Sequence, residues 1–307
     1  MKTLIIGAGA VGGYFGARLT AAGRDVTFLV RERRKAQLEQ TGLNITSPHG
    51  NFSVTPKLLL ASEITEAFDL ILLSTKAYQL TTVMDDFAAA VGPQTAILPL
   101  LNGMAHLDIL IARFGEQAVL GGSTRIVADV DADGTVHSME PLHDVVFGER
   151  DKELTPRIQA IAAEFANAGF DDKLSPDVIA FMWQKWVFLA ALGAITTLLR
   201  GSIGQVQAVP YGEETERAIL DECANIARAN GYPTPRPFFE AVSTRLTLPS
   251  SVLTASMYRD MMRNGPVEAD HILGDLLARG RSHAVDTPLL QAAYVQLAVY
   301  QAKIPQS

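Results

Sequence analysis

The sequence has a single cysteine, few aromatic residues and no excess of positive charge. With Cys223 alone, neither an intrachain disulfide framework nor a thiolate-rich metal or iron–sulfur site can form, which favours a reducing cytoplasm. Cys223 lies among alternating apolar and polar residues with no base nearby, so its predicted role is structural. The net charge of -7 argues against a basic surface for nucleic acid. We therefore expect a cytoplasmic protein with no nucleic-acid partner.

Long hydrophobic runs are also missing. The opening run, Leu4 to Ile6, is too short for the core of a secretory signal. The most apolar later stretch, 187–199, spans about 13 residues, whereas a helix needs roughly 20 residues to cross a bilayer. The six histidines show no metal-ligand spacing with one another or with the cysteine. We expect a buried helix over 187–199, no membrane association and no metal site.

The length and composition suit two folded domains, with 48% hydrophobic and 19% charged residues among 307. The first half alternates short apolar runs with longer stretches of helical spacing, which predicts an α/β fold with a doubly wound, Rossmann-type parallel sheet. The predicted strands are 3–6, 25–30, 69–74 and 95–101. Turn residues predict an inserted hairpin within 42–57, and a second β-rich segment follows at 118–148.

The second half is helical in pattern. A helix is predicted over 154–167, then a stop from Gly169 to Lys173 and a new helix start at Ser175-Pro176. This places the boundary near residue 172, between a Rossmann-type domain at 1–172 and an all-α domain at 173–307. The helices predicted in the second domain are 177–200, 212–230, 235–246, 266–281 and 287–302.

A glycine-rich loop directly follows the first predicted strand and begins a helix that is expected to stop at Gly23. Glycines at this spacing permit a tight turn and the close approach of a pyrophosphate to the helix N-terminus, whose amides and dipole favour an anion. An ordinary glycine turn is the alternative, but the strand–loop–helix context favours dinucleotide binding. The residues of the loop are Gly7, Ala8, Gly9, Ala10, Val11 and Gly12.

The second predicted strand is followed by Arg31. NAD-binding domains usually place an acidic residue here, which accepts a hydrogen bond from the ribose 2′-hydroxyl. A guanidinium instead pairs with a 2′-phosphate. Arg31, supported by Arg33 and Arg34, therefore favours NADP(H). The neighbouring Glu32 leaves the acidic arrangement open, with the arginines forming a solvated helix start.

Several other polar residues follow strands or interrupt apolar helices. Lys76 and Asn102 follow the third and fourth strands, at the edge where open parallel sheets bind ligands. Lys185 lies between Trp183 and Trp186 in an apolar helix, where desolvation can tune a lysine for proton donation. The alternatives are a solvated loop lysine for Lys76, an ordinary turn for Asn102 and, for Lys185, a side chain that snorkels to the surface. Ser256 and Glu268, on either side of a helix break, do not by themselves indicate catalysis.

Taken in order and spacing, these motifs resemble the ketopantoate reductase (2-dehydropantoate 2-reductase) family over essentially the whole chain. They are GAGAVG, Arg31, Thr75-Lys76-Ala77, Leu101-Asn102-Gly103-Met104, the tryptophan-flanked Lys185, and the segment from Ser256-Met257 to Glu268. The resemblance implies an N-terminal Rossmann domain, a helical C-terminal domain and an active site between them. It also implies that NADPH reduces a 2-oxo acid, and it makes a homodimer an expectation.

The resemblance assigns a role to each matching residue. It implies that Lys185 is the general acid, which protonates the alkoxide as hydride reaches the keto carbon. The other implied contacts are Asn102 near the nicotinamide and substrate, Lys76 and the backbone around Ile126 beside the cofactor, Ser256 at the substrate carboxylate, and Glu268 at the cofactor, where it helps to set the charge state of Lys185. These roles divide the work in the usual way, because the cofactor carries the hydride and the protein supplies orientation and charge.

The sequence departs from the family pattern after Lys185. Asparagines that face the substrate in the family are replaced by Leu189, Gly193 and Ile203. Helical spacing places Lys185, Leu189 and Gly193 on one face, which predicts an apolar wall. Polar contacts from Thr196, Thr197 or Arg125 are the alternative.

Four functions remain open from the sequence. The first is reduction of 2-dehydropantoate to pantoate in pantothenate biosynthesis, and the second is reduction of a bulkier or more apolar 2-oxo acid. The third is a non-catalytic protein that binds or senses NADP, which has no chemical need for a lysine in an apolar helix. The fourth is another dehydrogenase of the same two-domain plan, acting on 3-hydroxy acids or opines. Substrate preference separates the first, second and fourth.

Overall fold

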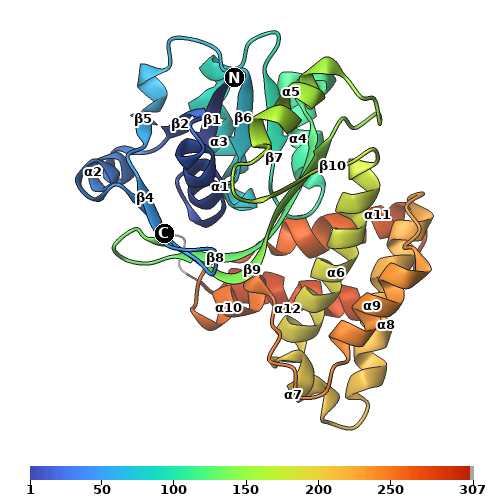
Figure 1. Cartoon of the computed structure of the whole chain (residues 1–307). Helices are drawn as coiled ribbons and strands as arrows, with labels where there is room; N and C mark the ends of the chain where they lie inside the picture. Colours follow the sequence, from blue (N-terminus) through green and yellow to red (C-terminus); the bar gives the residue numbers. More distant parts are fainter. Residues whose placement is uncertain (305–307) are drawn as a thin grey trace. The chain divides into compact units, whose positions relative to one another are not determined.

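The computed structural model describes residues 1–304 as two compact units (Figure 1). The first unit comprises Met1–Leu101 and His106–Ile179, and the second comprises Asn102–Ala105 and the chain from Ala180 onward. The loop after Leu101 therefore clusters with the helical unit, although sequence alone places it in the sheet domain. The boundary near residue 172 stays a prediction, and the division by contacts falls after Ile179.

The first unit contains a five-stranded parallel sheet. Its strands are β1 (Lys2–Ile6), β2 (Asp25–Leu29), β5 (Lys57–Leu59), β6 (Leu70–Leu73) and β7 (Ala96–Pro99), in the order β5-β2-β1-β6-β7. All residues of β6 and β7 are buried, as expected when helices cover both faces of a parallel sheet. The helices are α1 (Ala10–Ala21), α2 (Glu32–Thr41), α3 (Leu80–Phe87), α4 (Ala105–Phe114) and α5 (Pro156–Phe165). The predicted α/β fold class is confirmed.

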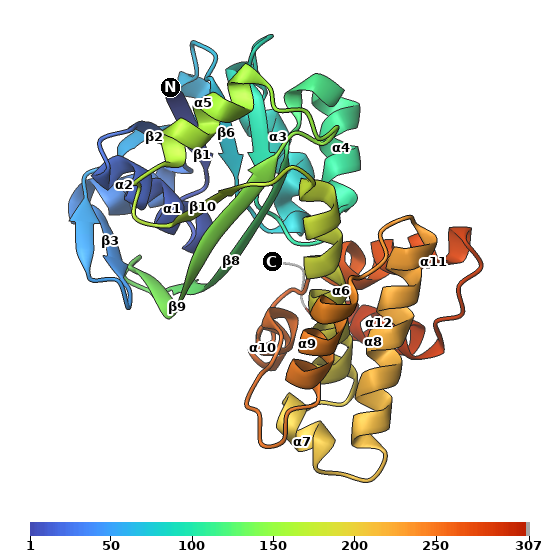
Figure 2. The same cartoon turned by 45° about the vertical axis from the view of Figure 1, so that its right-hand side comes forward.

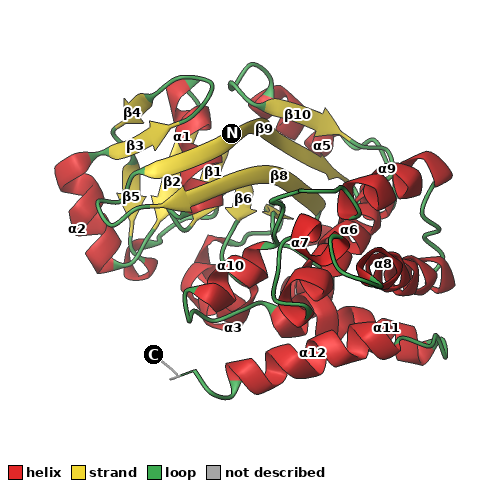
Figure 3. Cartoon of the chain, turned by 90° about the horizontal axis from the view of Figure 1, so that it is seen from below, coloured by secondary structure: helices red, strands yellow, loops and turns green. Residues whose placement is uncertain are grey.

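A second sheet completes the first unit (Figure 3). It contains β3 (Leu43–Thr46), β4 (Phe52–Val54), β8 (Gly121–Val130), β9 (Val136–Gly148) and β10 (Asp171–Leu174). The predicted hairpin within 42–57 is confirmed as the antiparallel pair β3–β4, and the segment 118–148 as the pair β8–β9. Helix α1 contacts β2 of the first sheet and β3, β8 and β9 of the second. The glycine-rich loop that precedes α1 is therefore held by elements of both sheets.

The prediction that Gly169 to Lys173 is a simple stop between two helices is wrong. Asp171–Leu174 forms β10, which pairs in parallel with Asp144–Phe147 of β9. The strand alternates exposed and half-buried residues, so its sequence has no apolar run to identify it. Pairing with a strand already in place, rather than local propensity, makes this segment extended.

The second unit is helical, as predicted (Figure 2). Its elements are α6 (Val178–Leu198), α7 (Ile203–Gln207), α8 (Gly212–Ala229), α9 (Arg236–Leu246), α10 (Ser256–Met262), a π-helix at Asp270–Gly274, α11 (Asp275–Ser282) and α12 (Pro288–Gln301). Helix α8 contacts α7, α9, α11 and α12. The short helices α7 and α10 were not predicted, and the helix expected over 266–281 begins as a π-helix. Cys223 is buried in α8, and burial raises the pKa of its thiol, which suits a structural cysteine.

Helix α6 is longer than the apolar run that predicted it. Its 21 residues make it the one helix in residues 1–304 that is long and apolar enough to cross a membrane, and 61% of its most apolar stretch is buried inside the protein. Trp186, Val187 and Ala194 are fully buried. These features are those of a core helix, as the sequence predicted.

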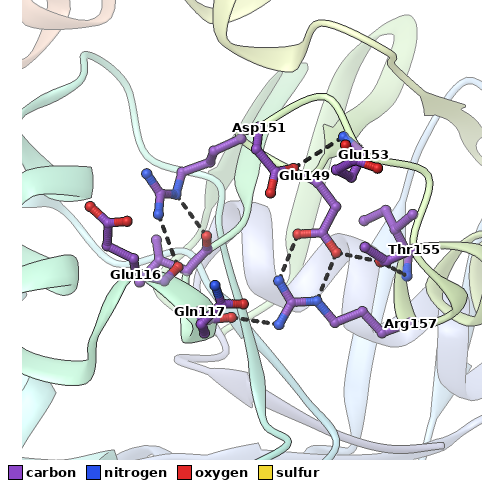
Figure 4. Close-up of polar contacts among 10 residues, drawn as sticks. Glu116, Gln117, Glu149, Asp151, Glu153, Thr155 and Arg157 are labelled. Atoms are coloured by element: carbon purple, nitrogen blue, oxygen red, sulfur yellow. Dashed lines mark hydrogen bonds and ion pairs between the residues drawn. The ribbon is translucent and has the colours of Figure 1, made fainter.

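A buried carboxylate fastens the end of β9 to the start of α5 (Figure 4). Glu149 accepts hydrogen bonds from Arg157 and from Thr155, the N-cap of α5. Burial opposes the charged form, but Arg157 and Thr155 outweigh it and lower the pKa of Glu149. Arg150 and Arg157 also donate to carbonyls of the 116–119 turn. This network is structural and lies in the first unit.

Candidate functional site

The glycine-rich loop has the geometry that dinucleotide binding requires. Gly7 follows β1 at φ +87°, a conformation that residues with a side chain rarely adopt. A side chain at Gly12 would collide with the Ser74 hydroxyl and the Gly7 carbonyl, so this glycine lets α1 pack against the sheet. Gly9, the N-cap of α1, has nothing within 4 Å of where a Cβ would lie. The space beside the N-cap of α1 is therefore open, which suits an approaching pyrophosphate.

Thr75 adds a polar atom beside this loop. It follows β6, and its methyl group lies 3.7 Å from the Cβ position of Gly7. Its hydroxyl is buried without a hydrogen-bond partner among the residues described. A buried hydroxyl without a partner is costly unless a ligand or water satisfies it. The loop and Thr75 together fit a dinucleotide, and the position of Thr75 after β6 is the sequence signal for it.

The three arginines after β2 have different environments. Arg31 is the exposed N-cap of α2, and Arg33 is exposed in the first turn. Arg34 instead donates to the carbonyls of Ala8 and Gly134, each at 3.0 Å. The expectation that Arg34 supports a 2′-phosphate is therefore not met by its contacts, because its guanidinium joins the glycine-rich loop to the β8–β9 turn. Arg31 and Arg33 are placed where solvent or a ligand can reach them.

The remaining first-unit residues lie at strand ends. Lys76 is exposed directly after Thr75, and Ile126 is half-buried at the irregularity of β8. Arg125, an alternative contact for the substrate, is paired with the buried Asp144. A pair with a buried carboxylate is strongly held, because removing one partner leaves an uncompensated charge. Arg125 is therefore committed to the fold of the second sheet.

Lys185 lies in the second unit, half-buried in α6. The neighbouring Trp186 is fully buried, and its indole N–H donates to the carbonyl of Ile272 at 2.9 Å. The guanidinium of Arg279 lies 5.7 Å from the Trp186 ring centre and 6.0 Å from that of Trp183. Lys185 thus sits in a helix whose indoles are held from both the π-helix and α11.

The Asn102 loop packs beside the π-helix and Trp186. Gly103 has φ +80°, and a Cβ on it would lie 2.5 Å from the His271 carbonyl oxygen and 3.9 Å from the Trp186 indole nitrogen. Asn102 itself is half-buried. The structure therefore brings the Asn102 loop beside the turn of α6 that carries Lys185, although the two residues are 83 positions apart by their numbers (185 − 102).

Glu268 lies just before the π-helix and belongs to the same cluster. It is buried at 6% exposure, and its carbonyl accepts from the N–H of Ile272 at 3.0 Å. Ile272 is the residue whose carbonyl receives the Trp186 indole. The segments that carry Lys185, Asn102 and Glu268 thus meet around Trp186 and Ile272.

Ser256 lies near a part of α6 that is closer to the C-terminal end of that helix than Lys185 is. It begins α10 and is half-buried, and the N–H of the preceding Ala255 donates to the Thr196 hydroxyl at 3.4 Å. The next residue, Met257, is buried, and its terminal methyl occupies the space where a Cβ on Gly193 would lie. The structure therefore places Ser256 near the face of α6 that runs from Lys185 through Gly193.

The wall at the substituted positions is apolar. Leu189 is half-buried, Gly193 is covered by Met257, and Ile203 is fully buried at the start of α7. The hydroxyls of Thr196 and Thr197 donate to the carbonyls of Leu192 and Gly193, each at 2.7 Å. Both hydroxyls therefore donate within their own helix, although the sequence suggested them as polar contacts in place of the missing asparagines.

Comparison with known proteins identifies the family of this chain. The family model for the ketopantoate reductase PanE/ApbA matches residues 3–152, and the model for its C-terminal domain matches residues 177–301. The chain belongs to the ketopantoate reductase family. The resemblance inferred from the motifs is confirmed, and the chain is an oxidoreductase with the fold of that family.

Individual ketopantoate reductase relatives match along their full lengths. The chain is 36% identical over 303 residues to an uncharacterized oxidoreductase, YkpB, of Bacillus subtilis, covering 99% of this chain and 100% of that protein. A structure of 2-dehydropantoate 2-reductase from Geobacter metallireducens superposes with a TM-score of 0.88 at 26% identity, covering 97% and 99% of the two chains. A structure of D-mandelate dehydrogenase with NADH and anilino(oxo)acetate has a TM-score of 0.86 at 22% identity, covering 99% of each. The last likeness shows a shared fold.

Proposed function

We propose that this ketopantoate reductase homologue uses NADPH to reduce a 2-oxo acid to a 2-hydroxy acid, with Lys185 as the general acid. The observation that carries the proposal is the assembly around Trp186, which gathers the Asn102 loop, Glu268 and the Lys185 turn within one unit. The glycine-rich loop and the buried Thr75 hydroxyl supply the matching cofactor site in the other unit. The conversion of 2-dehydropantoate to pantoate is the reaction that the family name suggests.

The residues of the first unit bind and orient the cofactor. The amides at Gly9 and the start of α1 would hold the pyrophosphate, and the Thr75 hydroxyl would donate a hydrogen bond to the cofactor. Lys76 would contribute positive charge at the end of β6, and the backbone at Ile126 would contact the cofactor. When bound, the cofactor supplies the hydride that adds to the keto carbon.

The residues of the second unit manage the proton and the substrate. Lys185 gives the proton from its Nζ to the carbonyl oxygen as that oxygen becomes an alkoxide, so that the product leaves as a neutral hydroxyl beside its carboxylate. Asn102 donates from its amide to hold the substrate carbonyl, and Ser256 donates its hydroxyl to the carboxylate. The buried carboxylate of Glu268 binds the cofactor and favours the protonated form of Lys185.

Replacing Arg31 tests the choice of NADPH. If the guanidinium pairs with the 2′-phosphate, Arg31→Ala should lower the ratio of kcat/KM for NADPH to that for NADH by about 10- to 100-fold, the worth of one lost hydrogen bond to a charged group. Lys35→Ala is the control, because Lys35 lies in the same helix but pairs with Glu63. An unchanged ratio in Arg31→Ala would move the 2′-phosphate site elsewhere, and a higher rate of the wild type with NADH would favour NAD(H).

A second candidate function is reduction of a bulkier, more apolar 2-oxo acid. Met257 fills the space at Gly193, and Leu189 lies one turn closer to Lys185 on the same helix. An apolar wall accepts hydrocarbon and offers no hydrogen bond to a substrate hydroxyl. The structurally similar D-mandelate dehydrogenase shows that this fold accommodates anilino(oxo)acetate in that protein.

A panel of 2-oxo acids decides between the two candidates. NADPH turnover is measured with 2-dehydropantoate and with branched aliphatic and aromatic 2-oxo acids. The apolar wall predicts that an apolar substrate has a kcat/KM at least equal to that of 2-dehydropantoate. A clear preference for 2-dehydropantoate removes the second candidate. Binding of NADPH with no turnover of any substrate would instead favour a non-catalytic role. A homodimer and a cytoplasmic location stay predictions.

A further inference from the structure

Trp186 joins three segments of the second unit that the proposed reaction uses. Its side chain is fully buried, and its indole N–H donates to the Ile272 carbonyl. The same indole nitrogen lies 3.9 Å from the position that a Cβ on Gly103 would occupy. One side chain, next to Lys185 in sequence, is therefore bonded to the π-helix after Glu268 and lies beside the loop of Asn102.

The carbonyl that receives the Trp186 indole belongs to the π-helix. The N–H of Asp275 bonds to the carbonyl of Asp270, five residues back, where an α-helix would bond four back. Such a widened turn interrupts the regular ladder of helix hydrogen bonds. The indole N–H of Trp186 donates to a carbonyl of this segment, that of Ile272. This buried hydrogen bond joins α6 to the π-helix, and breaking it would weaken the contact between the two elements.

Rotation of α6 decides where the Lys185 ammonium points. Adjacent residues on an α-helix are separated by about 100°, so a helix fixed through Trp186 also fixes the direction of Lys185. The Arg279 guanidinium, paired with Asp275 at 3.1 Å, lies over the Trp186 ring and packs the indole from the α11 side. The His271 carbonyl, one residue before the acceptor, sets the closest approach of the Asn102 loop.

We propose that Trp186 is a positioning residue for proton donation, which acts through its bond to Ile272 to set the direction of Lys185 and the seat of the Asn102 loop. The proposal rests on the proposed function, in which Lys185 is the general acid. It adds a residue that touches neither substrate nor cofactor.

Trp186→Phe tests the role, because it keeps an aromatic ring and removes the N–H donor. We expect kcat to fall about 10- to 100-fold, as for small misplacements of a catalytic group, with the NADPH dissociation constant within about twofold of the wild type. The alkaline limb of the kcat–pH profile should also shift. The reactivity of Lys185 is measured in the protein without cofactor, as its rate of acetylation by acetic anhydride followed by mass spectrometry. This rate should change by about threefold or more.

Two further variants keep the test decisive. Phe188→Leu removes a comparable ring from α6, where it packs under Arg245 of α9, and should leave kcat within about threefold. Gly103→Ala introduces a methyl against the His271 carbonyl and beside the Trp186 indole, and it should lower kcat by moving the Asn102 loop. If Trp186→Phe does not fold, 3-benzothienyl-alanine incorporated at position 186 keeps the shape of the indole and replaces its N–H by sulfur, and wild-type kcat in that protein overturns the proposal.

The outcomes separate this proposal from the proposed function. An active wild type and an inactive Lys185→Ala support the general acid. With those results in hand, a Trp186→Phe enzyme with normal kcat, pH profile and Lys185 reactivity overturns the positioning role alone. Equal losses in Trp186→Phe and Phe188→Leu overturn it as well, because they mark a purely structural effect. A wild type that turns over no 2-oxo acid overturns both.

Discussion

Lys185→Ala should lose about 10²- to 10⁴-fold in kcat while it binds NADPH nearly as tightly as the wild type. That range is the usual contribution of a positioned general acid, and the loss falls on kcat because the proton is transferred in the transition state. The half-buried Lys185 lies beside Trp186, whereas the residues proposed to hold the pyrophosphate are in the other unit. Steady-state rates with NADPH and fluorescence titration of the cofactor measure the two quantities separately.

Lys57→Ala is the matched control for this experiment. Lys57 is an exposed lysine of β5 that pairs with Asp25 at 2.6 Å, so its loss removes the same charge without touching the proposed site. Exposed pairs of this kind contribute roughly 0–1 kcal/mol, and both kcat and folding should stay near wild type. Turnover in Lys185→Ala that equals the Lys57→Ala rate removes Lys185 from the mechanism.

Glu216→Gln should make the protein more stable at pH 8 than the wild type, by about 2–3 kcal/mol. Glu216 is a fully buried residue of α8, and both of its carboxylate oxygens lack a hydrogen-bond partner among the residues described. Burial raises its pKa to about 7, with a further rise from Glu213 and an opposing effect of Arg217. One pKa unit corresponds to about 1.4 kcal/mol, which sets the scale of the effect.

The sign of the pH dependence follows from the raised pKa. The folded protein holds the Glu216 proton up to about pH 7, whereas the unfolded chain releases it near the ordinary glutamate pKa of 4.5. Stability from this group is therefore complete below pH 4.5 and is lost as the pH rises through 7. Glutamine stays neutral at every pH, so the curves of the two proteins should separate between pH 5 and 8.

Urea unfolding at a series of pH values measures this difference. Glu214→Gln is the control, because Glu214 is exposed two residues earlier on the same helix. The free energy of unfolding of Glu214→Gln should follow the wild type, and that of Glu216→Gln should decline less between pH 5 and 8. Parallel curves for Glu216→Gln and the wild type would show that Glu216 is charged and satisfied in the folded protein.

The parts of the fold that sequence predicts are those set by local patterns. Apolar runs identify β1, β2, β6 and β7, and the glycine-rich loop marks the start of α1, because burial on both faces and a backbone conformation that requires Gly7 leave direct traces in sequence. Strand β10 leaves no such trace, since it exists through pairing with β9. The π-helix is equally hidden, because its extra residue is accommodated by contacts from elsewhere.

In the candidate site, too, sequence predicts what local patterns set and misses what long-range contacts set. Lys185, Asn102, Ser256 and Glu268 are predicted from motifs and from the family resemblance, but the sequence cannot show that Trp186 and Ile272 join the segments of Lys185, Asn102 and Glu268. The role of Arg34 was also beyond reach, since its partners Ala8 and Gly134 are far apart in the chain. Likewise, the apolar wall at Leu189 and Gly193 follows from helical spacing, whereas its cover by Met257 requires the fold.

Transfer of deuterium from cofactor to product tests the central claim most directly. The protein is incubated with NADPH that carries deuterium at C4 of the nicotinamide, stereospecifically on each face in turn, and a 2-oxo acid from the panel. The account predicts a 2-hydroxy acid with one deuterium at C2 from one of the two labelled cofactors, and loss of that product in Lys185→Ala. NADPH binding without a deuterated 2-hydroxy acid from any substrate would contradict it.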